Sequence, residues 1–600
     1  MPTPLFVKKC VSACFMLLSC SIRLEASLSV SLTPSVSSPA PLGTAVSWSA
    51  QVDGSDSRTR WYRFRSRQVG GAFQTIVDYG PNNSLDWTEM DHEAAYQIEV
   101  SVQDKTTGET GTALSTFQLT SRLTSGGTPV LSNTKNPLVF LYSAAGCAAG
   151  GRMRVNFKGP DGITQTTPFQ ACHAGTSMNF YLGGLRAQSM YTVNHTLDTG
   201  TAITQGPTLT VNTPSISIAA PSYKVYQPLT SPTQSGILIQ FALYFPVLAT
   251  DLAGNIIWYY DGQLSTATRV VGNGIFMGIH EDTATDPSHQ WVRKFDLAGT
   301  TLAETNAARV SEQLVAMGRR PINAFHHEAR ALPDGKYMML SDNEQILTDV
   351  QGPGPVDVIG DEILILDSNL QVVWAWDAFD HLDTSRAATL GETCPSGAGC
   401  APYYLAPTAN DWLHGNSVQL TPDGQILYSC RHQDRIIKIN YDDGIGDGSL
   451  IWVFGKDGDF QIVSNDPSPL FSHQHDANIT QAGNGVRLLV FDDGNARNID
   501  DPNAHSRGQV WRLDEDSRSA TLNVNVDMGG YSFALGAAEV LAGGNFHFDA
   551  GWITDDPVGG MNSSRSVEVD PTGKIVYGVA IGTPEYRTYR LQNLYTAPAP

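Results

Sequence analysis

The sequence is poor in positive charge and has no long amphipathic helix. It contains 38 Lys and Arg against 59 Asp and Glu, which gives a formal charge of −21. Such a surface repels nucleic acid, because binding to a phosphate backbone needs clustered Lys and Arg. Any site for an anion must therefore be a local concentration of Arg and His. Apolar residues at helical spacing do not persist beyond about three turns, so we expect no mainly helical fold.

Beyond its first residues, the chain has no apolar run long enough to cross a bilayer. At the start, Lys8 and Lys9 precede an apolar run of about a dozen residues, which is typical of a secretory signal. The stretch "LLSC" resembles a bacterial lipobox with Cys20 as the lipidated residue, and cleavage near Ala26 is the alternative. We expect residues 1–26 to be a signal peptide. The protein is then exported, as a periplasmic protein, an outer-membrane lipoprotein or a secreted protein, and meets the membrane only through a possible lipid anchor.

Cysteine is scarce, and three of the eight cysteines lie in the signal. Export permits disulfides among the others. The segment "CPSGAGC" is a short loop that a bridge between Cys394 and Cys400 closes, and Cys147 with Cys172 is a natural second pair. Cys430 is then left over, and we interpret it as a buried thiol and not as a nucleophile.

Short strands dominate the sequence. Between residues 27 and 213, segments such as "AVSWSAQV", "TRWYRFRS" and "AYQIEVSVQD" alternate apolar and polar residues at period two, with frequent turns. We expect one or two immunoglobulin-like β-sandwich modules here, over 27–122 and 123–215, with a boundary in "TSRLTSGGTP". They contain no group of residues that indicates chemistry, so we interpret them as spacer or packing modules.

A longer repeat occupies residues 235–600. One half of it is an apolar strand, an Asp-containing turn and an aromatic strand, as in "ATDLAGNIIWYY" and "LILDSNLQVVWAW". The other half is a strand pair joined by a Gly turn. Together they predict four-stranded antiparallel units, of which about six fit this length. Such sheets repeated radially form a β-propeller, so we expect an all-β protein with a six-bladed propeller after the sandwich modules. The segment "YRTYRLQNLY" is expected to close the ring.

A histidine leads the strand pair in three successive units. His327 precedes Gly335 by eight residues, His475 precedes Gly483 by eight, and His414 opens "HGNSVQLTPDG". The innermost strand of each blade directs its first residue to the top of the central channel. We therefore expect the three imidazoles to converge on one axial pocket.

Three kinds of chemistry are compatible with such a pocket. Imidazoles bind transition metals, and "HQH" at 473–475 places two on one strand face, but no HExxH spacing is present. The histidines could equally be polar residues that only line a channel. Group transfer is favoured by "SCRHQDR", because the guanidinium of Arg431 suits sulfate or phosphate. There is no glycine-rich phosphate-binding loop.

These segments resemble the PAPS-independent bacterial arylsulfate sulfotransferases. The resemblance covers residues 235–600 and is carried by "DWLHGNSVQLTPDGQILYSCRHQDRIIKI", "FSHQHDANI" and "VFDDGNARN". It implies a six-bladed propeller that moves a sulfuryl group from a phenolic sulfate ester to a phenol without a nucleotide cofactor or a metal. This chain departs from the family pattern at Cys430, where Ser is frequent, and in the "CPSGAGC" insertion.

The same resemblance implies a role for each site residue. His475 in "QHDA" matches the nucleophile, His414 and Arg431 match the sulfuryl-binding residues, and His327 is preferred to its neighbour as the remaining active-site histidine. Further substrate contacts are expected from Asn416, His326 and Asn495.

The implied mechanism is ping-pong catalysis through an N-sulfohistidine on His475. A phenolic sulfate donor and a phenol acceptor are the expected partners, and nucleic acid is not; a homodimer is left open. Aromatic residues near the insertion are candidates to hold the aryl rings, although such residues are more often core: Tyr403, Tyr404 and Trp412. The alternatives are an aryl sulfate hydrolase and a non-catalytic propeller that binds glycans or proteins.

Overall fold

The computed structural model describes residues 28–53, 58–124, 126–230, 236–281, 286–395, 405–483 and 485–598. Within these ranges nearly all regular structure is β-strand, which confirms the predicted all-β class. The α-helices described are short: α1 (Ala307–Ala316), α2 (Ala378–His381) and α3 (Asn495–Asp500). In this part of the chain no helix combines the length and the apolar character that a membrane span requires. The predicted signal peptide, residues 1–26, lies outside the described residues.

The first sandwich packs two sheets around an aromatic core. Trp48 and Trp87 both meet Phe117 edge to face, at ring-centroid distances of 5.8 and 6.1 Å. The core residues come from strands that bury every second side chain, as period-two alternation predicts. One sheet has the order β1 (Val30–Pro34), β3 (Val46–Val52), β6 (Ser84–Trp87), and the other β2 (Ala40–Pro41), β8 (Thr110–Thr120), β7 (Ala95–Asp104), β4 (Arg60–Gln68), β5 (Gln74–Gly80).

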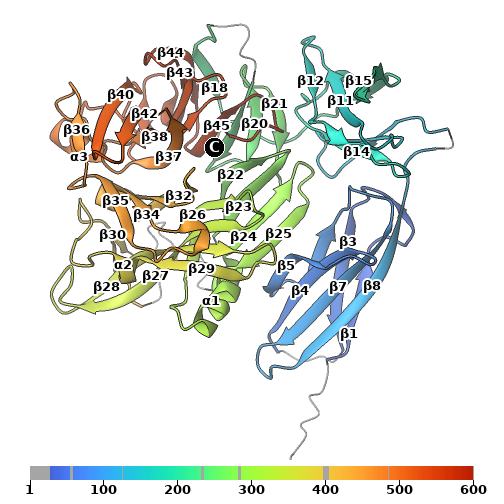
Figure 1. Cartoon of the computed structure of the whole chain (residues 1–600), viewed down its shortest axis with the longest axis horizontal. Coiled ribbons are helices and arrows are strands. Elements are labelled where there is room, and N and C mark those ends of the chain that lie inside the picture. Colours follow the sequence, from blue (N-terminus) through green and yellow to red (C-terminus); the bar gives the residue numbers. More distant parts are fainter. Residues whose placement is uncertain are drawn as a thin grey trace, which may run out of the picture.

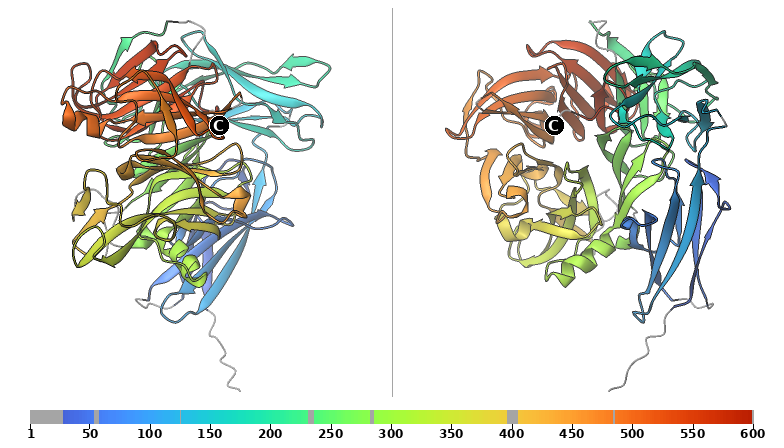
Figure 2. Two further views of the ribbon diagram at one scale, coloured as in Figure 1. Left: turned by 60° about the vertical axis from the view of Figure 1, so that its left-hand side comes forward. Right: turned by 45° about the vertical axis from the view of Figure 1, so that its right-hand side comes forward.

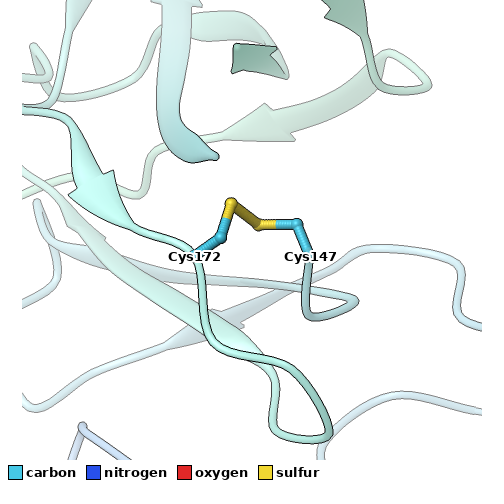
Figure 3. The surroundings of a disulfide bond; sticks show 2 residues. All are labelled: Cys147 and Cys172. Atoms are coloured by element: carbon cyan, nitrogen blue, oxygen red, sulfur yellow. A yellow bond between two sulfur atoms is a disulfide. The ribbon is translucent and has the colours of Figure 1, made fainter. Parts of the chain in front are cut away.

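The second sandwich contains the disulfide between Cys147 and Cys172, at a sequence separation of 25 (Figure 3). This pair was predicted and is confirmed. Cys400 lies outside the described residues, so the other predicted pair is not described, and Cys430 is a buried free thiol, as expected. One sheet has the order β14 (Met178–Leu182), β10 (Phe140–Ala144), β9 (Val130–Asn133), and the other comprises β11 (Arg152–Lys158), β12 (Thr164–Thr166), β13 (Gln170–Ala171), β15 (Met190–Asp198), β16 (Ile203–Gln205) and β17 (Leu209–Asn212).

Six four-stranded antiparallel sheets follow and are arranged around a common centre (Figures 1 and 2). We number them blades 1 to 6. From the centre outward, blade 1 is β45 (Glu585–Leu591), β19 (Ile237–Ala242), β20 (Leu248–Asp251), β21 (Ile256–Tyr259); blade 2 is β22 (Thr266–Gly272), β23 (Ile275–His280), β24 (Trp291–Asp296), β25 (Thr301–Asn306); and blade 3 is β26 (Ala324–Ala331), β27 (Tyr337–Thr348), β28 (Pro355–Leu366), β29 (Val372–Asp377).

The remaining blades repeat the pattern. Blade 4 is β32 (Gly415–Leu420), β33 (Ile426–Cys430), β34 (Arg435–Ile439), β35 (Leu450–Gly455); blade 5 is β37 (His475–Ala482), β38 (Gly485–Asp492), β39 (Arg507–Asp514), β40 (Ser519–Asp527); and blade 6 is β41 (Gly536–Val540), β42 (Phe546–Asp556), β43 (Gly560–Val569), β44 (Ile575–Ile581). Extra strands extend three of these sheets: β30 (Thr393–Pro395) and β31 (Thr408–Asp411) on blade 3, β36 (Gln461–Val463) on blade 5, and β18 (Tyr223–Gln227) on blade 6.

The C-terminal strand joins the two ends of this array. β45 pairs antiparallel with β19, so the first sheet of the repeat is completed by the last strand of the chain, as predicted from "YRTYRLQNLY". Next to this strand, buried ion pairs link the innermost strands of different blades. Arg587 lies 3.2 Å from Glu328, and Arg269 donates to Glu328 at 3.0 Å and also pairs with Asp476. These charges are almost fully buried and compensate one another, as buried ions must.

Both sandwiches are anchored to the sheet array. β5 of the first sandwich lies parallel to β25 of blade 2, so the two form one continuous sheet. The second sandwich contacts blade 1 through an ion pair between Arg186 and Asp251 at 2.7 Å. The hydroxyl of Tyr595 also donates to the Tyr181 carbonyl at 2.8 Å. Figure 2 shows both modules along one flank of the ring.

Candidate functional site

The three predicted histidines lie at the starts of neighbouring innermost strands. His327 is in β26, His414 directly precedes β32, and His475 is the first residue of β37. The imidazoles of His327 and His414 meet edge to face, with ring centroids 4.7 Å apart. His475 is fully buried, and the charges of Arg431 and His414 act on it. The structure therefore brings the residues of three blades into one polar cluster.

At the start of each of these three strands, an irregularity in the strand pairing sets the direction of the histidine side chain. The pairing register shifts between Phe325 and Ala329 in β26, between Gly415 and Ser417 in β32, and after His475 in β37. Such bulges re-aim side chains and are frequent beside active sites. Three residues at these points have left-handed φ angles, which non-glycine residues seldom adopt. They are His327 (φ 54°), His414 (φ 49°) and Asp476 (φ 49°).

Hydrogen bonds define the tautomer of His475. The backbone N–H of Leu535 donates to its Nε2 at 3.3 Å, so Nε2 has the lone pair. Nδ1 lies 2.7 Å from Oδ2 of Asp493 and donates to it. Burial, reinforced by the positive charges of Arg431 and His414, holds the pKa of His475 well below its ordinary value. The ring is therefore neutral, and the Nε2 lone pair can act as a nucleophile once it leaves the long contact with the Leu535 N–H.

Asp493 is the orienting partner of this imidazole. Its side chain is fully buried, and burial raises the pKa of its carboxyl well above the ordinary value, against the attraction of Arg431. The hydrogen bond to His475 Nδ1 holds the ring in one orientation. A positive charge that develops on the ring during reaction would strengthen this bond.

Asp411 organises the opposite side of the cluster. Its Oδ2 accepts a hydrogen bond from His414 Nδ1 at 2.7 Å, and its backbone carbonyl accepts one from His432 Nδ1 at 2.8 Å. Although burial opposes ionisation, His414 and Arg431 hold the pKa of Asp411 well below its usual range. The imidazoles of His414 and His432 are stacked, with centroids 4.5 Å apart.

Two acceptors hold the guanidinium of Arg431. Its Nη1 donates to Nε2 of His432 at 2.6 Å, and its Nη2 donates to the carbonyl of Phe533 at 3.0 Å. Burial, together with the charge of His414 and Arg431, outweighs the attraction of Asp411 and lowers the pKa of His432 to about 3, so this ring is a neutral acceptor. The Phe533 carbonyl also accepts from the predicted contact Asn495, at 3.1 Å. The loop that holds Arg431 through the Phe533 carbonyl is therefore the same loop that contributes the Leu535 N–H.

His326 and His327 form a second dyad. Burial lowers the pKa of His326, but Asp361, 3.5 Å from its Nε2, outweighs burial and raises this pKa to about 9. Burial and the charges of His414 and His326 hold the pKa of His327 well below its ordinary value. The two Nδ1 atoms are 3.0 Å apart. Because His326 is charged and His327 is neutral, His326 donates, and the proton of His327 is on Nε2.

Two other predicted residues are buried. Asn416 has no exposed surface, and its amide donates to the Gln474 carbonyl at 2.7 Å, so it supports the strand that begins at His475. Trp412 is 1% exposed and packs against Phe379 in the blade core. This is the core role that was weighed for it against contact with an aryl ring. Tyr403 and Tyr404 lie outside the described residues.

The groups that orient the site were not identified from the sequence. Asp493 lies inside the quoted segment "VFDDGNARN", and His432 directly follows Arg431 in "SCRHQDR". Their residue types were visible, but their partners depend on loop geometry. Two sets of side chains also have the composition of a metal site among the described residues, and both contain His432: Glu392 with His432 and His473, and Asp411 with His414 and His432.

Two solved structures that match this chain have low sequence identity to it and low TM-scores. The chicken interferon gamma receptor alpha chain is 14% identical, covering 30% of this chain and 100% of its own, with a TM-score of 0.13. The tricorn protease is 10% identical, covering 87% of this chain and 51% of its own, with a TM-score of 0.27. No curated protein shows significant similarity.

The family comparison is decisive. The model of the family described as Arylsulfotransferase (ASST) matches residues 224–590, which is more than half of the chain and includes every residue of the histidine and arginine cluster. The chain therefore belongs to the arylsulfotransferase family and is an aryl sulfotransferase, with an aryl sulfate as donor and a phenol as acceptor.

Proposed function

We propose that the enzyme transfers the sulfuryl group in two steps through an N-sulfohistidine on His475, without a nucleotide cofactor. The observation that supports this most is the hydrogen bonding of His475. A buried, neutral imidazole with its lone pair on Nε2 and its Nδ1–H on the carboxyl group of Asp493 has the arrangement of an activated nucleophile.

In the first step, Nε2 of His475 forms a bond to sulfur while the bond from sulfur to the phenolic oxygen breaks. The phenoxide leaves with the electron pair, and the imidazole becomes positively charged. The Nδ1–H bond to Asp493 then spreads this charge. Arg431 and His414 stabilise the negative charge on the sulfuryl oxygens, as preorganised donors do in other group transfers.

The leaving phenoxide receives its proton from the second dyad. His327 gives up the proton on Nε2 and takes one at Nδ1 from charged His326, so the net donor is His326. In the second step the acceptor phenol returns a proton along the same route, and its oxygen takes the sulfuryl group from His475. The enzyme is regenerated with all protons in place.

The experiment that tests this sequence is donor-only exposure to 4-nitrophenyl sulfate. We expect a burst of about one nitrophenol per enzyme molecule, followed by slow release, and full turnover only after a phenol is added. Steady release without a phenol would instead indicate hydrolysis.

Replacing Arg431 with lysine should lower kcat/KM for 4-nitrophenyl sulfate by about 10²- to 10³-fold. A lysine ammonium cannot donate to both His432 and the Phe533 carbonyl while also facing the sulfuryl oxygens. Initial-rate kinetics measure the effect. Arg512→Lys, on an exposed position of β39, is the matched control and should stay within about twofold. Equal activity in the two variants would contradict the proposed role.

The pH dependence should differ between donors. His326 has its pKa raised to about 9, so its charged form is present below that pH and is lost as the pH rises through it. Phenyl sulfate releases a strongly basic phenoxide and needs the proton, so its donor-step rate should fall above this pH. 4-Nitrophenyl sulfate releases a weakly basic phenoxide and should show no such decrease. Rapid-mixing rates measure both, and identical profiles would contradict the proton route.

The disulfide supports a proposal about location. A bridge such as Cys147–Cys172 persists in oxidising compartments and is rare in the cytosol. We propose that the protein is exported, with the lipobox-like "LLSC" segment as the candidate lipidation signal.

A further inference from the structure

A second polar cluster lies beside the sulfuryl-binding residues, and of its members only His432, which holds Arg431, belongs to the site described above. It consists of Glu392, next to β30, His432, and His473, two residues before the nucleophile. One ligand atom from each residue lies within 4.8 Å of the others. Two imidazoles and one carboxylate are a frequent ligand set for zinc and related ions.

The outer contacts of this cluster also match those of metal ligands. Nδ1 of His432 donates to the carbonyl of Asp411 at 2.8 Å, and Nδ1 of His473 lies 3.0 Å from Oδ1 of Asp434. Histidines that bind metals almost always donate their other ring N–H to a carbonyl or carboxylate in this way. Among the described residues, Nε2 of neither ring contacts the backbone, and in each ring it lies on the side away from the anchored Nδ1.

The backbone supports the same arrangement. His473 and Asp434 both have left-handed φ angles, 55° and 53°, and Asp434 Oδ1 also accepts the backbone N–H of His473 at 2.7 Å. The ring of His473 is thus fixed before any ligand binds. Glu392 pairs with Nε2 of His473, and its side chain is 20% exposed, which provides a route from solvent. A metal ion would replace the hydrogen bond between these two atoms.

We propose that Glu392, His432 and His473 form a binding site for a divalent transition-metal ion of the zinc type, and that the bound ion inhibits sulfuryl transfer. The inhibition rests on the proposed function, whereas the binding does not. Hard ions such as Mg²⁺ and Ca²⁺ prefer all-oxygen sites and should not bind here.

The reason for inhibition is competition for one lone pair. Nε2 of His432 accepts the hydrogen bond from Arg431 Nη1 at 2.6 Å. A metal ion on this nitrogen removes the acceptor and places positive charge beside the guanidinium. Arg431 then keeps only the Phe533 carbonyl as a fixed partner and is displaced from its position next to the sulfuryl group.

The other metal-like set, Asp411 with His414 and His432, is less suitable. His414 Nδ1 already donates to Asp411 Oδ2 at 2.7 Å, and the Nδ1 of His432 is used by the Asp411 carbonyl. In the Glu392 set, by contrast, both Nδ1 atoms are anchored outside the set, and Nε2 of His473 already faces the Glu392 carboxylate. Substitutions at Glu392 and His473 separate the two sets, because neither residue belongs to the second one.

The test is calorimetric titration of the full-length protein with Zn²⁺ after chelator treatment, with Mg²⁺ as the comparison ion. We expect saturable binding of about one Zn²⁺ and no heat from Mg²⁺. Glu392→Gln and His473→Gln should each weaken Zn²⁺ binding by about 10-fold or more. His505→Ala, which changes an exposed His–Asp pair, is the matched control and should bind as the wild type does.

Turnover of 4-nitrophenyl sulfate with phenol provides the second readout. Zn²⁺ should inhibit the wild type and His505→Ala at the concentrations that saturate the site, and a chelator should reverse the inhibition. Both site variants should resist by the same factor by which their binding weakens. Circular dichroism confirms that each variant is folded. Zn²⁺ binding that is absent in the wild type, or unchanged in both site variants, would overturn the site; binding without inhibition would overturn only the competition with Arg431.

Discussion

Replacing His475 with alanine is expected to lower turnover of 4-nitrophenyl sulfate by about 10⁴-fold or more. The variant loses the only group to which the proposed mechanism transfers the sulfuryl group, and Arg431 and His414 can still bind the ester but cannot react with it. The donor-only burst should disappear completely. Steady-state kinetics and rapid mixing measure the two effects separately.

The loss must be distinguished from misfolding, because His475 is 2% exposed. Thermal unfolding and near-ultraviolet circular dichroism of the variant should stay close to those of the wild type. His505→Ala is a histidine deletion at an exposed position and should keep full activity. A folded His475→Ala variant with turnover above about a tenth of wild type would be incompatible with covalent catalysis at this residue.

Replacing Asp493 with asparagine should slow the donor step by about 10²- to 10⁴-fold. If the new amide NH₂ faces Nδ1, it forces the proton of His475 onto Nε2 and removes the nucleophilic lone pair. If the amide oxygen faces Nδ1, the tautomer survives but the stabilising charge is lost. Either orientation lowers the rate of sulfuryl transfer to His475 and leaves donor binding at Arg431 intact.

The readout is therefore a decrease in burst rate with little change in the donor concentration at half-saturation. Asp527→Asn, at an exposed position, serves as the matched control. Burial raises the pKa of Asp493, so the alternative is that its carboxyl works in the protonated form. Asparagine mimics that form, and an Asp493→Asn variant with a wild-type burst rate would establish it and remove the role proposed for the carboxylate.

The general architecture could be predicted from sequence because it depends on repetition. Period-two alternation and regularly spaced turns predict short strands, and a histidine at the same place in three repeats predicts that their side chains share one end of the sheets. His327, His414 and His475 do lie at the starts of β26, β32 and β37. The Cys147–Cys172 bridge was similarly accessible, because few cysteines remain once the signal is set aside.

The orienting contacts could not be predicted, because each joins segments that the pattern does not relate. Asp493 reaches His475 from the end of β38, and Leu535 contributes a backbone N–H that no side-chain pattern encodes. Asn416 makes a further contact of this kind: its amide donates to the Gln474 carbonyl, and the substrate contact expected of it stays a prediction. Such details depend on bulges, which shift the direction of side chains by one position.

The most direct test of the proposed mechanism is to locate the sulfuryl group on the enzyme. The protein is exposed to donor without phenol, quenched at alkaline pH, digested and mapped by mass spectrometry. The proposal predicts one added sulfuryl group, on His475, that disappears when a phenol is supplied before quenching. A stable label on another residue, or no label on an enzyme that has released one equivalent of nitrophenol, would contradict it.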